Sequence, residues 1–149
     1  MVKMNKLFIY YSNTGNGDIV AYKMETLGYE VRRVIPKKEL PKAFFFKVLT
    51  GGFLAGINNK AKLVNYDNNI EGYDEIVIGS PIWNDRLSTP INAVLEKTDI
   101  AGKNVRFVLY AGSGNAKKVF GQLEKYVQNP LVTFLKDPKK YPDELEKLV

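Results

Sequence analysis

The stretch YYSNTGNGD, residues 10–18, joins a buried-strand pattern to a helix pattern through glycine and small polar residues. The apolar run LFIYY (7–11) leads into it and is typical of a strand buried in a sheet. The residues that follow (16–27) place their apolar side chains on one broad helical face, and Gly28 comes where such a helix ends. This strand–turn–helix unit is a starting element of an α/β fold.

The turn inside this unit has the composition of an anion-binding loop. The first N–H groups of a helix have no partner within it, and the helix dipole adds partial positive charge at that end. Gly15 and Gly17 let the backbone approach an anion closely, while Ser12 and Thr14 add hydroxyl donors. The loop lacks the lysine and spacing of a Walker A loop, and Val20 replaces the third glycine of a dinucleotide-binding turn. We therefore predict a site for a single phosphate; a βα turn with helix-capping residues is the alternative.

The rest of the chain alternates strand and helix patterns. Further strands are expected at 29–35, 75–80, 105–112 and 131–135, and helices at 41–63, 89–97, 115–127 and 142–149. Ser88 or Thr89 is expected to cap the helix at 89–97. The alternation predicts an α/β three-layer sandwich, with a five-stranded parallel sheet between helices, in a single domain spanning residues 1–149. Five such strands commonly take the order 2-1-3-4-5, which opens a ligand crevice at the carboxyl ends of strands 1 and 3.

The residue types that the chain lacks exclude several classes of catalytic site and metal site. It contains neither cysteine nor histidine, which excludes Ser-His-Asp triads, thiolate nucleophiles and histidine or zinc-thiolate metal sites. Any reaction that the protein carries out is therefore expected to depend on a bound cofactor. The net charge is +6, but the lysines are spread along the whole chain and do not indicate nucleic-acid binding. The amino-terminal apolar run is too short for a signal peptide, and no window reaches membrane-spanning length. We expect a cytoplasmic protein without stable membrane insertion.

Two later loops are expected to face the same crevice. SPIWNDRLSTP (80–90) follows the third strand and contains Trp83, the sole tryptophan, and AGSGN (111–115) follows the fourth strand. We interpret Trp83 as a loop residue that offers a flat surface for stacking on a planar ring. The alternative is a tryptophan folded back on the core. Arg86 is expected to point to solvent.

Three motifs in this order resemble those of the flavodoxin family. SNTGNGD (12–18) looks like the family's phosphate loop, Ser/Thr-x-Thr-Gly-x-Thr, and GSPIWNDRLSTPINAVLE (79–96) is similar to its loop that supplies an aromatic flank for the flavin. The resemblance covers nearly the whole chain and implies a flavodoxin-like sandwich that binds FMN non-covalently. It implies phosphate contacts from Ser12, Asn13, Thr14, Gly15, Asn16 and Gly17. It also implies that the isoalloxazine ring lies against Trp83, next to Pro81, Ile82 and Asn84, with its pyrimidine side along Tyr110, Ala111, Gly112 and Ser113.

The sequence departs from the family pattern at three points. Gly17 stands where the family has threonine, which predicts a lost hydroxyl donor, lower FMN affinity and a gain in affinity on Gly17→Thr. The acidic surface usual in flavodoxin carriers is replaced by a basic one. The last helix, at 142–149, is short.

The resemblance implies an electron carrier that serves redox partner proteins. One alternative is an NAD(P)H-dependent FMN or quinone reductase, for which only Arg86 is placed to hold the additional phosphates. Another is a flavin-free binding module that uses the basic, Phe-rich surface of residues 37–62. We favour a helix packed on the sheet for the Phe-rich segment 43–57 over a membrane-surface or partner-binding patch.

Overall fold

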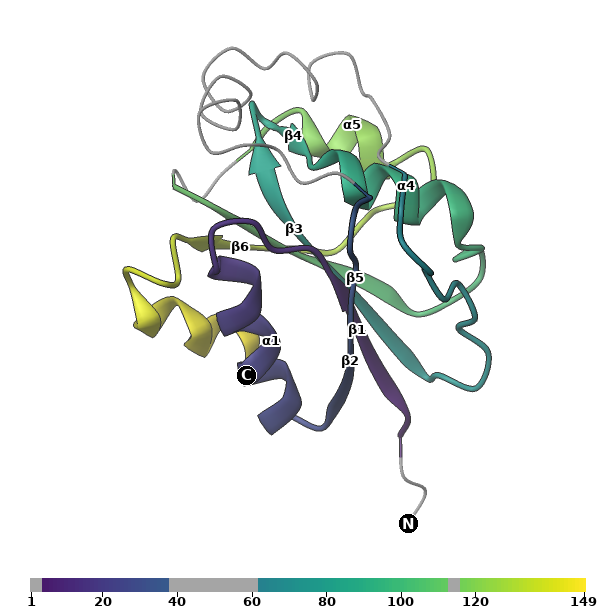
Figure 1. Ribbon diagram of the computed structural model, residues 1–149, viewed down its shortest axis with the longest axis horizontal. Helices are drawn as coiled ribbons and strands as arrows, with labels where there is room; N and C mark the ends of the chain where they lie inside the picture. The colour runs from purple at the N-terminus through teal and green to yellow at the C-terminus, as the bar shows by residue number, and fades with distance from the viewer. Residues whose placement is uncertain (1–3, 38–61, 113–115) are drawn as a thin grey trace.

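The computed structural model describes residues 4–37, 62–112 and 116–149 of the chain. Five strands form its parallel sheet (Figure 1): β1 (Lys6–Tyr10), β2 (Tyr29–Arg33), β3 (Glu75–Trp83), β5 (Val105–Ala111) and β6 (Val132–Lys136). They lie in the order β2-β1-β3-β5-β6, and each neighbouring pair in this series is parallel. Counted along the chain, this is the predicted order 2-1-3-4-5, so the expected fold class is confirmed.

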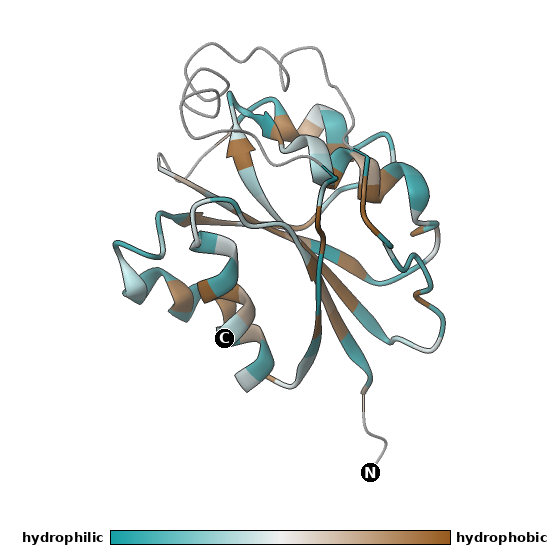
Figure 2. Ribbon diagram, in the orientation of Figure 1, coloured by the Kyte–Doolittle hydropathy of each residue, from teal (hydrophilic) through white to brown (hydrophobic). Residues whose placement is uncertain are grey.

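Helices cover both faces of this sheet, as predicted (Figure 1). One face carries α1 (Asn16–Thr26) and the 3₁₀ helix η1 (Pro142–Leu148), and the other carries α4 (Thr89–Lys97) and α5 (Val119–Leu123). Each face has its own apolar cluster: Phe8 of β1 lies on the α1 side, whereas Leu7 and Ile9 lie on the α4 side. This alternation follows from the pleat of a strand that is buried on both faces. Figure 2 shows hydrophobic residues recurring along the central strands.

Strand β3 is longer than predicted. It continues past residue 80 to Trp83 and turns back into β4 (Arg86–Leu87), which pairs with it antiparallel. Asn84 and Asp85 form the turn with φ values of 51° and 62°, and a two-residue hairpin turn of this kind requires positive φ at both positions. The prediction that Trp83 lies in a loop is therefore wrong, because Trp83 is the last residue of a buried strand.

The helices on the α4 side differ from expectation in two details. Helix α4 has its predicted bounds, and Ser88 takes the N-cap position. The Ser88 Oγ nevertheless lies 2.9 Å from the Ser80 Oγ and makes no capping hydrogen bond. Helix α5 is shorter than the predicted 115–127, whose residue 115 lies outside the described part, and has Gly121 at its centre. Glycine there disfavours a longer helix.

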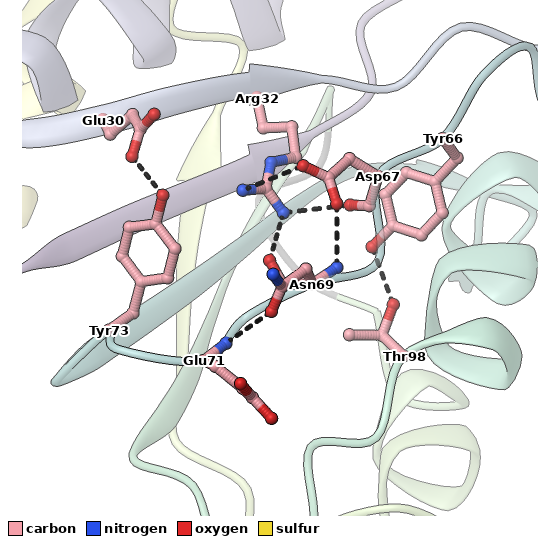
Figure 3. A network of polar contacts seen from close by, with 8 residues as sticks. All are labelled: Glu30, Arg32, Tyr66, Asp67, Asn69, Glu71, Tyr73 and Thr98. Atoms are coloured by element: carbon pink, nitrogen blue, oxygen red, sulfur yellow. Dashed lines mark hydrogen bonds and ion pairs between the residues drawn. The ribbon is translucent and has the colours of Figure 1, made fainter.

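Side chains of the edge strand β2 hold the chain segment that precedes β3. Figure 3 shows the polar network that holds this segment in place, formed by Glu30, Arg32, Tyr66, Asp67, Asn69, Glu71, Tyr73 and Thr98. Arg32 Nη1 donates to the carbonyl oxygens of Asp67 and Asn69, at 2.9 Å each. The Tyr66 hydroxyl lies 2.7 Å from Thr98 Oγ1, beyond the end of α4. Side chains of β2 and of the end of α4 thereby hold the segment in place.

The predicted helix at 41–63 falls almost wholly outside the described residues, and its Phe-rich part, 43–57, does so entirely. Within the described ranges, none of the helices has the length and apolar character needed to cross a membrane.

Candidate functional site

The loops that follow β1, β3 and β5 lie at the carboxyl edge of the sheet. The chain leaves β1 for α1 on one face, but it leaves the β3–β4 hairpin for α4 on the opposite face. Such a reversal between neighbouring strands is a topological switch point, where open α/β sheets bind ligands. The described parts of the three predicted loops therefore meet at one edge, as the sequence predicts.

The loop between β1 and α1 starts its helix without a side-chain cap. Gly15 occupies the N-cap position with φ 99° and ψ −11°, a left-handed conformation that favours glycine. Its carbonyl oxygen accepts a hydrogen bond from the Ile19 N–H at 3.2 Å. Within the described residues, no side-chain hydrogen bond caps the start of this helix. Glycine is itself a common N-cap residue, so the phosphate site and the alternative of a plain turn both stay predictions. The first N–H groups of an α-helix have no acceptor within the helix, so at the start of α1 they can bond to water or to an external acceptor.

Two buried polar atoms of this loop have no hydrogen-bond partner within the described residues. They are Oγ of Ser12, a residue that is only 2% exposed, and Nδ2 of Asn13. A buried polar group without a partner costs about 1–3 kcal/mol, so its persistence needs an explanation. Both atoms are donors, and with the uncapped start of α1 they form a donor set suited to an anion.

Gly17 lies against Tyr110, and a side chain does not fit at position 17. A Cβ atom there would lie 2.6 Å from Tyr110 Oη, 2.7 Å from Ser12 Cβ and 2.8 Å from the Tyr11 carbonyl oxygen. These distances are too short for non-bonded atoms, so a larger residue would displace Tyr110 or the loop. The structure therefore contradicts the expected gain from Gly17→Thr. The glycine is a packing requirement of the loop.

The hydroxyl of Tyr110 donates to the Tyr11 carbonyl oxygen next to Gly17. Burial is the main cause that raises the pKa of the Tyr110 hydroxyl well above its ordinary value, and Tyr10 and Asp18 raise it further. The hydroxyl therefore keeps its proton and remains a donor at neutral pH. The ring belongs to the apolar cluster on the α1 side, whereas the resemblance implied that Tyr110 lies along the pyrimidine side of a flavin.

Trp83 packs edge-on against Tyr11 inside the core. The two ring centroids are 5.9 Å apart with an interplanar angle of 86°, and Trp83 is 1% exposed. This packing corresponds to the alternative of a tryptophan folded back on the core. It also holds the ring of Tyr11, the residue directly before Ser12. Stacking of Trp83 on a planar ligand stays a prediction, and it requires the hairpin to uncover a face of the ring.

The other predicted ring contacts occupy varied environments. Pro81 and Ile82 are buried in β3, Asn84 is exposed in the hairpin turn, Ala111 is half-buried, Gly112 is exposed, and Ser113 lies outside the described residues. Arg86, expected in solvent, is half-buried, and its Nε is buried without a partner in the described part of the chain.

Sequence reasoning missed two cations beside the loop. Arg33, the last residue of β2, donates from Nη2 to the Ser12 carbonyl oxygen at 3.2 Å and pairs with Asp18. Lys139, in the turn after β6, donates from Nζ to the Thr14 carbonyl oxygen at 3.3 Å. The position of Arg33 could have been inferred, because the predicted sheet order places the end of β2 beside the first loop. No sequence signal separates Lys139 from the other lysines.

Residues 50–140, more than half of the chain, match the sequence profile of the family described as Flavodoxin. The chain belongs to the flavodoxin family. The matched range includes β3, β5 and the hairpin, whereas residues 12–17 precede it. The interpretation of that loop therefore rests on its own geometry. A search of curated proteins finds no match.

Solved structures share the fold over nearly the full chain. A protein from Bacteroides eggerthii DSM 20697 has 20% sequence identity and a TM-score of 0.74, covering 97% of this chain and 99% of that chain. A flavoprotein from Lactobacillus acidophilus NCFM, in complex with FMN, has 23% identity and a TM-score of 0.68, covering 95% and 98%. A flavodoxin from the domain Archaea has 13% identity and a TM-score of 0.50, covering 97% and 90%. These likenesses show the flavodoxin-like fold.

We expect Gly17→Ala to lower the free energy of unfolding of this flavodoxin-family protein by about 1–3 kcal/mol, the usual cost of overpacking. The cause is the overlap of the added Cβ with Tyr110 and Tyr11. Gly121→Ala is the matched control, because a Cβ at that position meets nothing within 4 Å. Chemical denaturation of the three proteins measures the difference. Equal stability of the wild-type protein and Gly17→Ala would contradict this packing.

Tyr110→Phe removes one hydroxyl and leaves the Tyr11 carbonyl oxygen without its side-chain donor. We expect a loss of about 1–3 kcal/mol in the free energy of unfolding, the cost of an unsatisfied buried acceptor. A double-mutant cycle with Gly17→Ala should give a coupling energy of at least about 0.5 kcal/mol, because Tyr110 Oη is the nearest atom to the new Cβ. Strictly additive effects would show that the two residues act independently.

Proposed function

We propose that this protein binds FMN non-covalently, with the phosphate at residues 12–17, and carries electrons between partner proteins. The observation that carries the proposal is the pair of buried donors, Ser12 Oγ and Asn13 Nδ2, which lack partners in the described residues and lie in a loop that starts a helix without a cap. Membership of the flavodoxin family supports FMN as the ligand, and the structurally similar flavoprotein from Lactobacillus acidophilus was solved with FMN.

The donors of the loop suit a phosphate monoester. A bound phosphate would accept hydrogen bonds from Ser12 Oγ, from Asn13 Nδ2 and from the first N–H groups of α1. Thr14 is exposed and offers a second hydroxyl. The positive end of the α1 dipole favours the negative charge of the phosphate. Since the loop is short and lacks the third glycine of a dinucleotide-binding turn, it suits one phosphate group in preference to two.

We propose that the flavin ring lies against the β3–β4 hairpin and the end of β5. Among the predicted ring contacts that the structure describes, Asn84 and Gly112 are exposed, whereas Trp83 is buried. When bound, FMN supplies the redox chemistry through its isoalloxazine ring. The residues of the chain hold the phosphate, orient the ring and exclude water from the side that faces the protein.

The arginines support a carrier in preference to an NAD(P)H-dependent reductase. A reductase needs cationic groups near the flavin to hold the additional phosphates of a dinucleotide. Three of the four arginines pair with acidic residues within the fold, namely Arg32, Arg33 and Arg106. The fourth arginine, Arg86, lies in β4 of the hairpin, beside the proposed position of the ring. A carrier needs no dinucleotide site, and a net charge of +6 suits encounter with an acidic partner protein.

FMN should bind about ten- to a hundredfold more tightly than riboflavin, because a hydrogen bond to a charged group contributes about 1.5–3 kcal/mol. Flavin fluorescence during titration measures both affinities. Ser12→Ala should weaken FMN binding and leave riboflavin binding unchanged, since riboflavin has no phosphate for Ser12 to contact. Equal affinities of the wild-type protein for the two flavins would exclude the phosphate site. Binding of neither flavin would favour the flavin-free module of residues 37–62.

The FMN-loaded protein should oxidise NADH and NADPH at a negligible steady-state rate when it is alone. It should accept electrons from a separate flavodoxin reductase, and the rate should fall as ionic strength rises, because salt screens the attraction between a basic carrier and an acidic partner. Absorbance of the bound flavin follows both reactions. Rapid turnover with NAD(P)H and a quinone, without a second protein, would contradict the carrier proposal and support the reductase alternative.

A further inference from the structure

We propose that Lys139 supplies a positive charge that selects phosphorylated over unphosphorylated flavin at the 12–17 loop and makes FMN binding depend on ionic strength. The inference rests on the proposed function, because it concerns the same phosphate site. It adds a binding residue from the opposite end of the chain, in a turn that the sequence motifs do not include.

The turn that carries Lys139 has a fixed backbone. Asp137 has a φ of 38°, and its carbonyl oxygen accepts hydrogen bonds from the N–H groups of Lys140 at 2.9 Å and Tyr141 at 2.8 Å. The Asp137 N–H donates to the Ala111 carbonyl oxygen at 2.9 Å, which ties the turn to the end of β5. The position of Lys139 is therefore set by backbone contacts to the sheet.

Lys139 contacts the loop through both its backbone and its side chain. Its N–H donates to Asn16 Oδ1 at 2.9 Å, at the first residue of α1. Its Nζ donates to the Thr14 carbonyl oxygen at 3.3 Å and lies 3.6 Å from the place that a Cβ on Gly15 would take. An ammonium group has three N–H donors. The Thr14 carbonyl uses one of them, so the charge stands beside the loop with donors left for a ligand.

The charges of Asp18 and Arg33 beside the loop pair with each other, whereas Lys139 forms no ion pair with a described residue. Asp18, in the first turn of α1, pairs with Arg33 and accepts a hydrogen bond from the Tyr10 hydroxyl at 2.9 Å. Lys139 makes no ion pair with any residue that the structure describes, and it is exposed. The positive charge of Lys139 is therefore not neutralised by an ion pair within the described residues. A phosphate dianion gains from such a charge, while the uncharged ribityl chain of riboflavin does not.

Lys139→Gln tests this role, because glutamine removes the charge and keeps a polar side chain. Lys140→Gln is the matched control: it changes the net charge of the protein equally, but the Lys140 Nζ lies over the Tyr141 ring, 5.5 Å from its centroid. FMN and riboflavin are titrated into each protein at low and high salt, and the free energy of unfolding is measured without flavin.

At low salt we expect Lys139→Gln to weaken FMN binding about five- to tenfold, the scale of a partly exposed ion pair with a doubly charged partner. Riboflavin binding should not change, and the loss should shrink at high salt because salt screens exposed charges. Lys140→Gln should stay within about twofold of the wild-type protein for both flavins. Lys139→Arg should restore most of the FMN affinity.

Three results would overturn the inference. If the wild-type protein prefers FMN but Lys139→Gln keeps that preference, the phosphate site stands and Lys139 has no part in it. If Lys139→Gln weakens FMN and riboflavin equally and also lowers the free energy of unfolding, Lys139 only fastens the turn to the loop. If the wild-type protein does not distinguish FMN from riboflavin, the proposed phosphate site fails, and the role of Lys139 fails with it.

Discussion

The hydrogen bond from the Tyr110 hydroxyl to the Tyr11 carbonyl oxygen fixes the point at which β1 becomes the loop. It places a phenol side chain where the side chain of residue 17 would otherwise lie, so position 17 must be glycine. On the other side of the sheet, Trp83 packs edge-on against the Tyr11 ring and so also holds the end of β1 in place. Two buried aromatic residues from β3 and β5 therefore set the geometry of a loop that follows β1.

This support explains how the loop keeps unpaired donors in place. Ser12 Oγ is buried without a partner in the described residues, and a free loop would relax to give it one. Tyr110 and Trp83 hold Tyr11, and Arg33 holds the Ser12 carbonyl oxygen. These contacts oppose a rearrangement of the loop that would give the Ser12 hydroxyl a partner. If the proposed phosphate binds here, the stability that the unpaired donors cost the free protein would be recovered on binding.

Local patterns predicted the architecture, and long-range contacts account for what they missed. The positions of the strands and the bounds of α4 follow from apolar periodicity and helix-start signals, which a sequence shows directly. The strand order was predicted from the order that five alternating strands commonly take. The hairpin after β3 had a readable signal in Asn84 and Asp85, two residues that tolerate positive φ. The need for glycine at position 17 had none, because Tyr110 and Tyr11 lie 99 positions apart. Lys139 reaches Thr14 across 125 positions, a contact that only the folded chain reveals.

A crystal structure of the protein with FMN tests the central claim most directly, namely that a loop held by Tyr110 and Gly17 presents Ser12 to a phosphate. The account predicts a phosphate oxygen within hydrogen-bond distance of Ser12 Oγ and of the first N–H groups of α1, while the Tyr110 hydroxyl still donates to the Tyr11 carbonyl oxygen. A phosphate bound away from residues 12–17, or a loop that rearranges so that Tyr110 leaves Tyr11, would contradict it.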